Sequence, residues 1–151
     1  GSEMCIRDRF KEINTLGAQL HTLSDGDIAA ALWAARPEGN YDMLLGIGAA
    51  PEGVITATAI RGIGGVFEGR LVFRSDAEEA RAANMIDDDL TRLWSARDLC
   101  QSDDAVFVAS GVCDGYLPGV KINQDGTIGT FAEMIDVASR KITRHDRIHN
   151  Q

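Results

Sequence analysis

The chain has 151 residues, enough for one domain with a hydrophobic core and too few for two domains of ordinary size. It carries 23 acidic and 15 basic residues, and the net charge of −8 argues against binding to nucleic acid or to an anionic membrane. No apolar run approaches the roughly 18 residues of a membrane span, and no signal peptide is visible, so we expect no membrane partner.

The first nine residues carry no pattern that continues into the rest of the chain. Gly1 and Ser2 look like a scar left by tag removal, so we read no function from residues 1–9. We treat residues 10–151 as a single α/β domain.

The first half of the chain alternates strand-like and helix-like patterns. Apolar spacing predicts a helix over residues 10–16, and alternation predicts a short strand over residues 18–23. A helix is predicted over residues 27–36, with its first residue, Asp27, as the N-cap. A buried strand over residues 41–47 and a helix over residues 51–65 follow. This order favours parallel strands joined by right-handed crossovers.

The second half reads as richer in strands. A strand over residues 69–75 precedes a charged helix over residues 76–94. An apolar strand over residues 105–112, a partly alternating stretch over residues 127–138 and a final strand over residues 139–149 follow. We expect these last strands to be antiparallel.

A first candidate site is Asp25-Gly26-Asp27, between a predicted strand and a predicted helix. Two carboxylates one glycine apart can bind sugar hydroxyls or a hard cation. An Asx-turn followed by an N-cap explains both aspartates without a ligand, and the motif alone leaves both interpretations open.

A second candidate site is the glycine-rich run from Gly46 to Gly53, "GIGAAPEG". Its glycines allow a tight turn, and free N–H groups at the start of the following helix favour an anion such as phosphate. Glu52 lies in the first turn of that helix, where the helix dipole favours its charge, and it can also hold a divalent cation. The run is neither a Walker loop nor a clean Rossmann fingerprint, and a plain strand-to-helix turn stays an open alternative.

Three other groups of residues carry weaker signals. His145 and His149 are four residues apart, a metal-pair spacing on a helix, but in the predicted strand we expect a solvated surface. Asp87-Asp88-Asp89 is expected on a solvated helix face. Cys5, Cys100 and Cys113 form no Cys-x-x-Cys pair, which favours a reducing, cytoplasmic setting, and the last two are expected in or near the core.

Taken together, four stretches of the chain resemble one family. "LGAQLHTLSDGDIAAAL", "LLGIGAAPEGVITATAIRGIGGVFEGRLV", "DDAVFVASGVCDGYLPGV" and "SRKITRHDRIH" are similar to the C-terminal half of class II fructose-1,6-bisphosphatases. These enzymes include the bifunctional fructose-1,6-/sedoheptulose-1,7-bisphosphatases of cyanobacteria. The resemblance covers residues 10–149, and it implies the layered α/β, lithium-sensitive (inositol monophosphatase-like) sugar phosphatase fold.

The resemblance also implies a chemistry and a set of site residues. The family hydrolyses the 1-phosphate of a sugar bisphosphate with Mg²⁺ or Mn²⁺. By resemblance, Asp25, Gly26 and Asp27 bind sugar phosphate, and the loop around Gly48 and Ala49 lies at the substrate. The resemblance makes Glu52 a metal ligand.

Several departures from the family pattern limit this expectation. The family's other metal-binding carboxylates belong to an N-terminal half that this sequence does not contain. A basic phosphate-gripping segment expected near residues 3–6 reads Glu-Met-Cys-Ile, the stretch around residues 75–87 is short, and many members have glycine in place of Ala49. We therefore expect weak metal binding and no complete catalytic set in this chain.

Three functional hypotheses remain open. The chain is a C-terminal sugar bisphosphatase domain inactive by itself, a phosphatase completed by another chain, or a non-catalytic sugar-phosphate-binding or structural module. We favour the first, with its parent acting in gluconeogenesis or the Calvin cycle. Because a missing half leaves apolar surface uncovered, we also expect self-association, giving a homo-oligomer.

Overall fold

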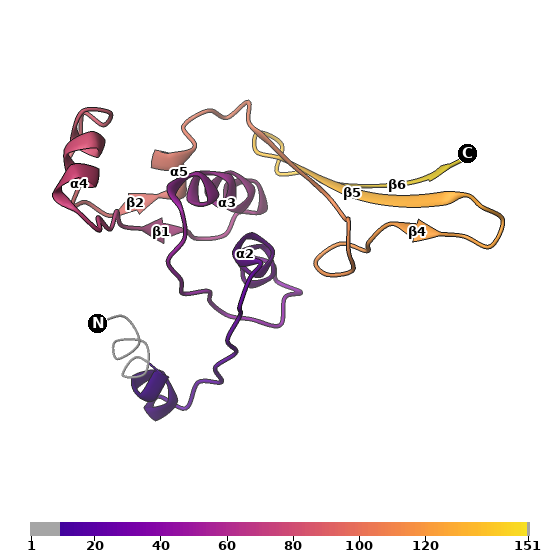
Figure 1. Ribbon diagram of the computed structural model, residues 1–151, viewed down its shortest axis with the longest axis horizontal. Helices are drawn as coiled ribbons and strands as arrows, with labels where there is room; N and C mark the ends of the chain where they lie inside the picture. Colours follow the sequence, from indigo (N-terminus) through magenta and orange to yellow (C-terminus); the bar gives the residue numbers. More distant parts are fainter. Residues whose placement is uncertain (1–9, 151) are drawn as a thin grey trace.

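The structure is a computed structural model, and it describes residues 10–150 (Figure 1). Residues 1–9, including the expected phosphate-gripping position, lie outside this range. The helices are α2 (Asp27–Ala35), α3 (Ala50–Ile63), α4 (Asp76–Ala83) and α5 (Ala96–Leu99), and residues 10–15 are also helical. The strands are β1 (Glu68–Gly69), β2 (Trp94–Ser95), β3 (Val106–Ser110), β4 (Lys121–Ile122), β5 (Ile128–Asp136) and β6 (Ile142–His149).

The two helices that carry the candidate sites begin and end where local backbone chemistry requires. α2 ends at Ala35, and Arg36 is extended because the following proline disfavours a helical residue before it. α3 has Pro51 in its first turn, and Gly64 ends it with a φ of 88°. Both predicted helices are confirmed. The predicted N-cap is wrong by one residue, because Gly26 is the N-cap and Asp27 is the first helical residue.

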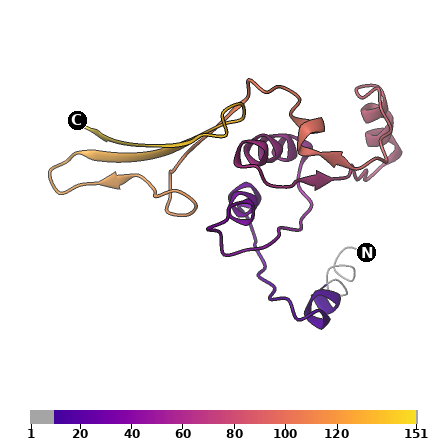
Figure 2. The ribbon, with the colours of Figure 1, turned by 180° about the vertical axis from the view of Figure 1, so that it is seen from behind.

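A four-stranded antiparallel sheet forms the other half of the molecule. The long strand β5 pairs with β3, β4 and β6, all antiparallel to it. The β5–β6 hairpin projects away from the helices, as Figure 2 shows from behind. The predicted antiparallel strands of the last third are therefore confirmed. A second, smaller sheet consists of β1 and β2, also antiparallel.

The core lies where the helices meet the inner face of this sheet. Leu32 of α2, Ala59 of α3, Phe107 of β3 and Ile135 of β5 form its central cluster. Gly62 is also buried, and a Cβ built on it would lie 2.4 Å from a methyl carbon of Ile135. The absence of a side chain at this position therefore lets α3 pack directly on β5.

Two strands predicted in the first half are wrong. Neither residues 18–23 nor residues 41–47 form a strand, and all strand pairs within residues 10–150 are antiparallel. The apolar pattern of the second segment is real, but 70% of Met43, 60% of Leu45 and 81% of Ile47 is exposed. A strand needs a partner for its backbone groups, and no described segment supplies one here.

The middle of the chain also differs from its predicted pattern. Of the strand predicted over residues 69–75, only the first residue is paired, in β1. The helix predicted over residues 76–94 ends at Ala83 and is followed by turns. Asp87-Asp88-Asp89 is exposed, as expected, but it lies in the irregular segment after this helix and not on a helix. The architecture is α/β, and no helix within residues 10–150 is long and apolar enough to cross a membrane.

Candidate active site

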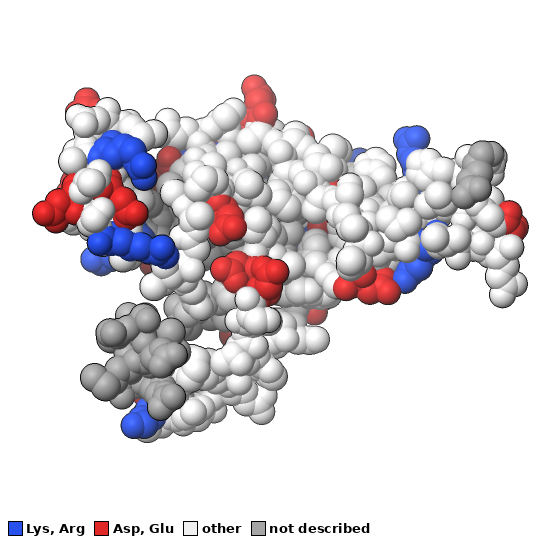
Figure 3. Space-filling model, viewed as in Figure 1, with Lys and Arg blue, Asp and Glu red and all other residues white. Residues whose placement is uncertain are grey.

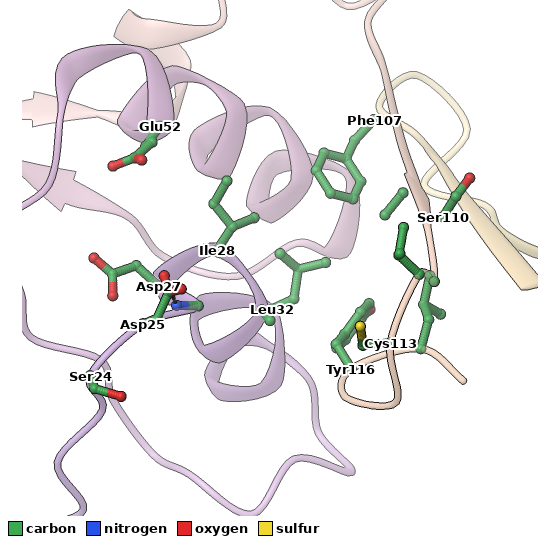
Figure 4. Close-up of a pocket in the computed structure, with 16 residues that line it drawn as sticks. Ser24, Asp25, Asp27, Ile28, Leu32, Glu52, Phe107, Ser110, Cys113 and Tyr116 are labelled. Carbon is green, nitrogen blue, oxygen red and sulfur yellow. Dashed lines mark hydrogen bonds between the residues drawn. The ribbon is translucent and has the colours of Figure 1, made fainter. Parts of the chain in front are cut away.

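A cleft of about 480 Å³ opens beside the N-terminal end of α2 (Figure 4). One wall is polar and acidic, and it consists of Ser24, Asp25, Gly26, Asp27 and Glu52. The facing wall comes from β3 and the loop after it, and includes Phe107, Ser110, Cys113 and Tyr116. Ile28 and Leu32 of α2 line the cleft between these walls.

Two carboxylates of the acidic wall meet beside one glycine. A Cβ built on Gly48 would lie 3.1 Å from Oε2 of Glu52 and 3.7 Å from Oδ2 of Asp27. The two carboxylates come from the first turns of different helices, α3 and α2. The structure therefore brings together the acidic residues of both predicted motifs, which are 25 residues apart in the sequence.

Glu52 is held in place by the start of its own helix. Its Oε2 accepts a hydrogen bond of 3.1 Å from the backbone N–H of Ala49, the N-cap residue. This contact satisfies one free donor of the helix terminus and orients the carboxylate. Gly48 and Ala49 thus contact or adjoin Glu52, although neither lines the cleft itself.

The cleft has a one-sided charge. Among residues 10–150, its lining includes three carboxylates, those of Asp25, Asp27 and Glu52, and no lysine or arginine. On the face in Figure 3, acidic side chains occur over the middle of the molecule, and acidic and basic side chains are mixed toward its two ends. A bare phosphate would therefore be repelled by this wall unless a cation lay between them.

The facing wall is supported by a buried polar cluster that the sequence analysis did not identify. The hydroxyl of Tyr116 donates a hydrogen bond of 2.5 Å to Oε1 of Glu133, a fully buried carboxylate. Arg36 donates to the same oxygen at 2.6 Å. Burial first, and then the hydrogen bond to Glu133, raise the pKa of Tyr116 above its ordinary value. The Tyr116 hydroxyl therefore stays protonated across the physiological pH range.

A sequence signal for this cluster exists. Glu133 lies on β5 two residues from Ile135, so strand alternation places both on the core face. A charged residue at a core position is rarely left unpaired, and it points to donors from other segments. The sequence does not show which segments these are, because the bond between Arg36 and Glu133 spans 97 residues.

The remaining candidates lie away from the acidic wall. His145 and His149 are on β6 and exposed, as expected, and Nε2 of His149 is 2.8 Å from the Thr130 hydroxyl oxygen. Cys100 is buried as predicted, whereas the prediction for Cys113 is wrong: it is exposed on the loop after β3. Within residues 10–150, no three His, Cys, Asp or Glu side chains are arranged as a metal site.

Comparison with known proteins gives the family. A family model described as bacterial fructose-1,6-bisphosphatase, glpX-encoded, matches residues 6–149. The chain belongs to this family. The resemblance stated from the four sequence stretches is thereby confirmed.

Two similar curated proteins carry both bisphosphatase activities in their names. The chain is 34% identical to the fructose 1,6-bisphosphatase class 2/sedoheptulose 1,7-bisphosphatase of Synechococcus sp. (strain RCC307), over 95% of this chain and 47% of that protein. It is 35% identical to the enzyme of the same name from Thermosynechococcus vestitus, over 94% of this chain and 45% of that protein. The chain thus spans about half the length of the curated relatives it matches.

Proposed function

We propose that this chain forms part of a metal-dependent sugar bisphosphatase that hydrolyses the 1-phosphate of fructose 1,6-bisphosphate or sedoheptulose 1,7-bisphosphate. The observation that carries the proposal is the acidic wall, where Asp25, Gly26, Asp27 and Glu52 line one cleft in a chain of the glpX family. The lithium-sensitive phosphatase fold and a cytoplasmic location belong to the same proposal.

The acidic wall is chemically suited to a hard divalent cation. Mg²⁺ and Mn²⁺ prefer carboxylate oxygens, and Glu52 and Asp27 present theirs beside Gly48. Oε1 of Glu52 is left for a metal, because the hydrogen bond to Ala49 uses the other oxygen. When bound, such an ion polarises phosphoryl oxygens and lowers the pKa of water.

The other residues of this wall have binding roles in the proposal. The Asp25-Gly26-Asp27 turn offers acceptors for sugar hydroxyls, and Oδ1 of Asp25 also accepts a 2.7 Å hydrogen bond from the Gly26 N–H. Gly48 keeps the space next to Glu52 open, since any side chain there would crowd the carboxylate. Ala49 orients Glu52 through its backbone N–H.

We propose that this chain alone is inactive. The two carboxylates of Glu52 and Asp27 hold a hydrated divalent ion weakly, and among residues 10–150 no three His, Cys, Asp or Glu side chains are arranged to hold a metal ion. The missing ligands would come from the part of the family's length that this chain does not span, or from another chain.

The test is phosphate release from fructose 1,6-bisphosphate with Mn²⁺ or Mg²⁺, together with calorimetric binding of the same sugar. We expect no turnover, and binding that strengthens with the metal. Glu52→Gln should abolish the metal effect while keeping an amide oxygen for the Ala49 N–H. Glu52→Ala, which loses that contact as well, reports the additional effect of helix capping.

The outcomes separate the three hypotheses. Turnover that disappears in Glu52→Gln would show that a complete site assembles from this chain and would contradict the inactive-domain proposal. Turnover that appears only when the N-terminal half of a relative is added would support completion by another chain. A sugar affinity that is unchanged by the metal and by Glu52→Gln would favour a non-catalytic binding module.

A further inference from the structure

The buried cluster around Glu133 lies behind the cleft and is not used by the proposed function. Glu133 is on β5, its side chain is fully buried, and its carboxylate binds three donors. Arg36 and Tyr116 donate to Oε1 at 2.6 and 2.5 Å, and Nε of Arg144 on β6 donates to Oε2 at 3.3 Å. Three segments far apart in sequence therefore meet at one carboxylate.

The Arg36 contact fixes the helix that carries the acidic wall. Arg36 is the C-cap residue of α2, and only 5% of its side chain is exposed. α2 is nine residues long, and Asp27 is its first residue. A helix of this length is a rigid rod of about 13 Å, so holding its C-terminal end restricts where Asp27 lies.

The Tyr116 contact fixes the facing wall. Its ring packs edge-on to Trp33 of α2, with centroids 5.6 Å apart, and the Arg36 guanidinium carbon lies 5.3 Å from the Tyr116 centroid. The ring is thereby held in orientation, and the hydrogen bond to Glu133 sets how far the loop lies from β5. Both walls are thus positioned relative to the same buried oxygen.

Stability alone does not account for a charge at this position. A buried ion pair is often no more stabilising than apolar side chains of the same volume, because desolvation offsets the attraction. The carboxylate instead fixes geometry. Its short hydrogen bonds to the Arg36 guanidinium and the Tyr116 hydroxyl define distances and angles that apolar packing would leave adjustable.

We propose that Glu133 is a positioning residue that sets the separation between the two walls of the cleft. It acts through its hydrogen bonds to Arg36, on the helix of the acidic wall, and to Tyr116, on the facing wall. The inference rests on the proposed function in one respect: the ligand whose fit depends on that separation is taken to be a sugar bisphosphate. A ligand that contacts both walls binds well only when their spacing matches it.

The test uses two variants that each remove one donor from Glu133, and one control variant. Tyr116→Phe keeps the ring against Trp33 and removes only the hydroxyl. Arg144→Gln removes a donor that belongs to neither wall. Tyr41→Phe makes the same chemical change at an exposed tyrosine outside the cleft. Glu133→Ala is avoided, because it would leave the buried Arg36 with only its 3.4 Å contact to Glu38 as a counter-charge.

Hydrogen exchange, melting temperature and fructose 1,6-bisphosphate affinity with Mn²⁺ are then measured for each variant. In Tyr116→Phe we expect amides of residues 111–117 to exchange roughly tenfold faster or more, and the affinity to fall several-fold. Arg144→Gln and Tyr41→Phe should stay within about twofold of the unsubstituted chain in both measurements.

Two results would overturn the proposal. One is exchange in Tyr116→Phe that matches the unsubstituted chain. The other is an equal change in exchange and affinity for Tyr116→Phe and Arg144→Gln. If Glu133 only stabilised the fold, both variants would lower the melting temperature alike and neither would act specifically on the cleft. If the unsubstituted chain does not bind the sugar, the proposed function fails, and the exchange comparison by itself decides the positioning role.

Discussion

At the scale of single residues, Gly48 is the position where an added side chain would crowd the acidic wall most closely. A Cβ at this position would lie 3.1 Å from Oε2 of Glu52, closer than ordinary van der Waals contact. Because that oxygen also accepts the Ala49 N–H, Glu52 cannot retreat freely without weakening its hydrogen bond.

We therefore expect Gly48→Ala to displace the Glu52 carboxylate by a few tenths of an ångström and to weaken Mn²⁺-dependent sugar binding by roughly 1 kcal/mol, about fivefold. Isothermal titration calorimetry gives the affinity. Gly46→Ala is the matched control, since nothing lies within 4 Å of a Cβ built there. Equal affinities for the two variants would show that the Glu52 position does not matter for binding.

A second residue-scale prediction concerns acid stability. Hydrogen bonds from the Ser95 hydroxyl and N–H, together with Arg92, lower the pKa of Asp98 to about 2. In the unfolded chain this carboxyl titrates near pH 4, so its contribution to stability is full above about pH 4 and is lost as the pH falls toward 2.

Asp98→Asn should accordingly lower the melting temperature at pH 7 and flatten its decline between about pH 4 and pH 2. Thermal unfolding followed by circular dichroism at several pH values measures this. Asp104→Asn, at an exposed carboxylate in the neighbouring turn, should leave the pH dependence unchanged. An identical pH dependence in Asp98→Asn and the unsubstituted chain would contradict the assignment.

At the scale of elements, the packing of α3 on β5 depends on the glycines of the helix. Gly53 and Gly62 both lie inside α3, and each costs helix propensity relative to alanine. They differ in their surroundings: a Cβ on Gly53 meets nothing within 4 Å, whereas one on Gly62 meets Ile135 at 2.4 Å.

The two alanine substitutions should therefore have opposite signs. Gly53→Ala is expected to raise the free energy of unfolding by about 0.5–1 kcal/mol. Gly62→Ala is expected to lower it by roughly 1–3 kcal/mol, because α3 must move off β5. Urea unfolding measures both, and a stabilising Gly62→Ala would show that α3 and β5 are not packed as described.

At the scale of the whole molecule, much apolar surface is left uncovered. Large exposed side chains include Met43, Leu45, Ile47, Val108 and Ile122, from separate segments of the chain. Apolar surface exposed at so many positions favours association. The net charge of −8 opposes association at low salt.

We expect the chain to self-associate with increasing concentration, and more strongly in salt that screens its charge. Sedimentation velocity over a concentration series measures this directly. Monomeric sedimentation at the highest concentration and salt would contradict the prediction. Added N-terminal half of a relative should compete with self-association if it covers the same surface.

The sequence by itself predicts those elements whose signals are local. Pro51 and Gly64 mark the ends of α3, and Pro37 marks the end of α2. The strands predicted over residues 127–138 and 139–149 correspond to β5 and β6, and their expected antiparallel arrangement is confirmed. The candidate acidic residues were also found in this way, since turn and helix-start motifs are read from consecutive residues.

The sequence misleads wherever an element depends on a distant partner. The apolar residues 41–47 have the composition of a buried strand, yet no described strand pairs with them. Period and composition report what a segment is able to form, and only the presence of neighbours decides whether it forms. The parallel sheet expected for the first half fails for this reason.

Tertiary structure alone decided how the cleft is assembled. Local motifs identified Asp27 and Glu52, but their approach beside Gly48 requires α2 and α3 to pack together. The facing wall, and the carboxylate of Glu133 behind it, join residues up to 97 positions apart. Backbone hydrogen bonds along a helix or hairpin are encoded by near neighbours, whereas a buried charge finds its donors only when the chain folds.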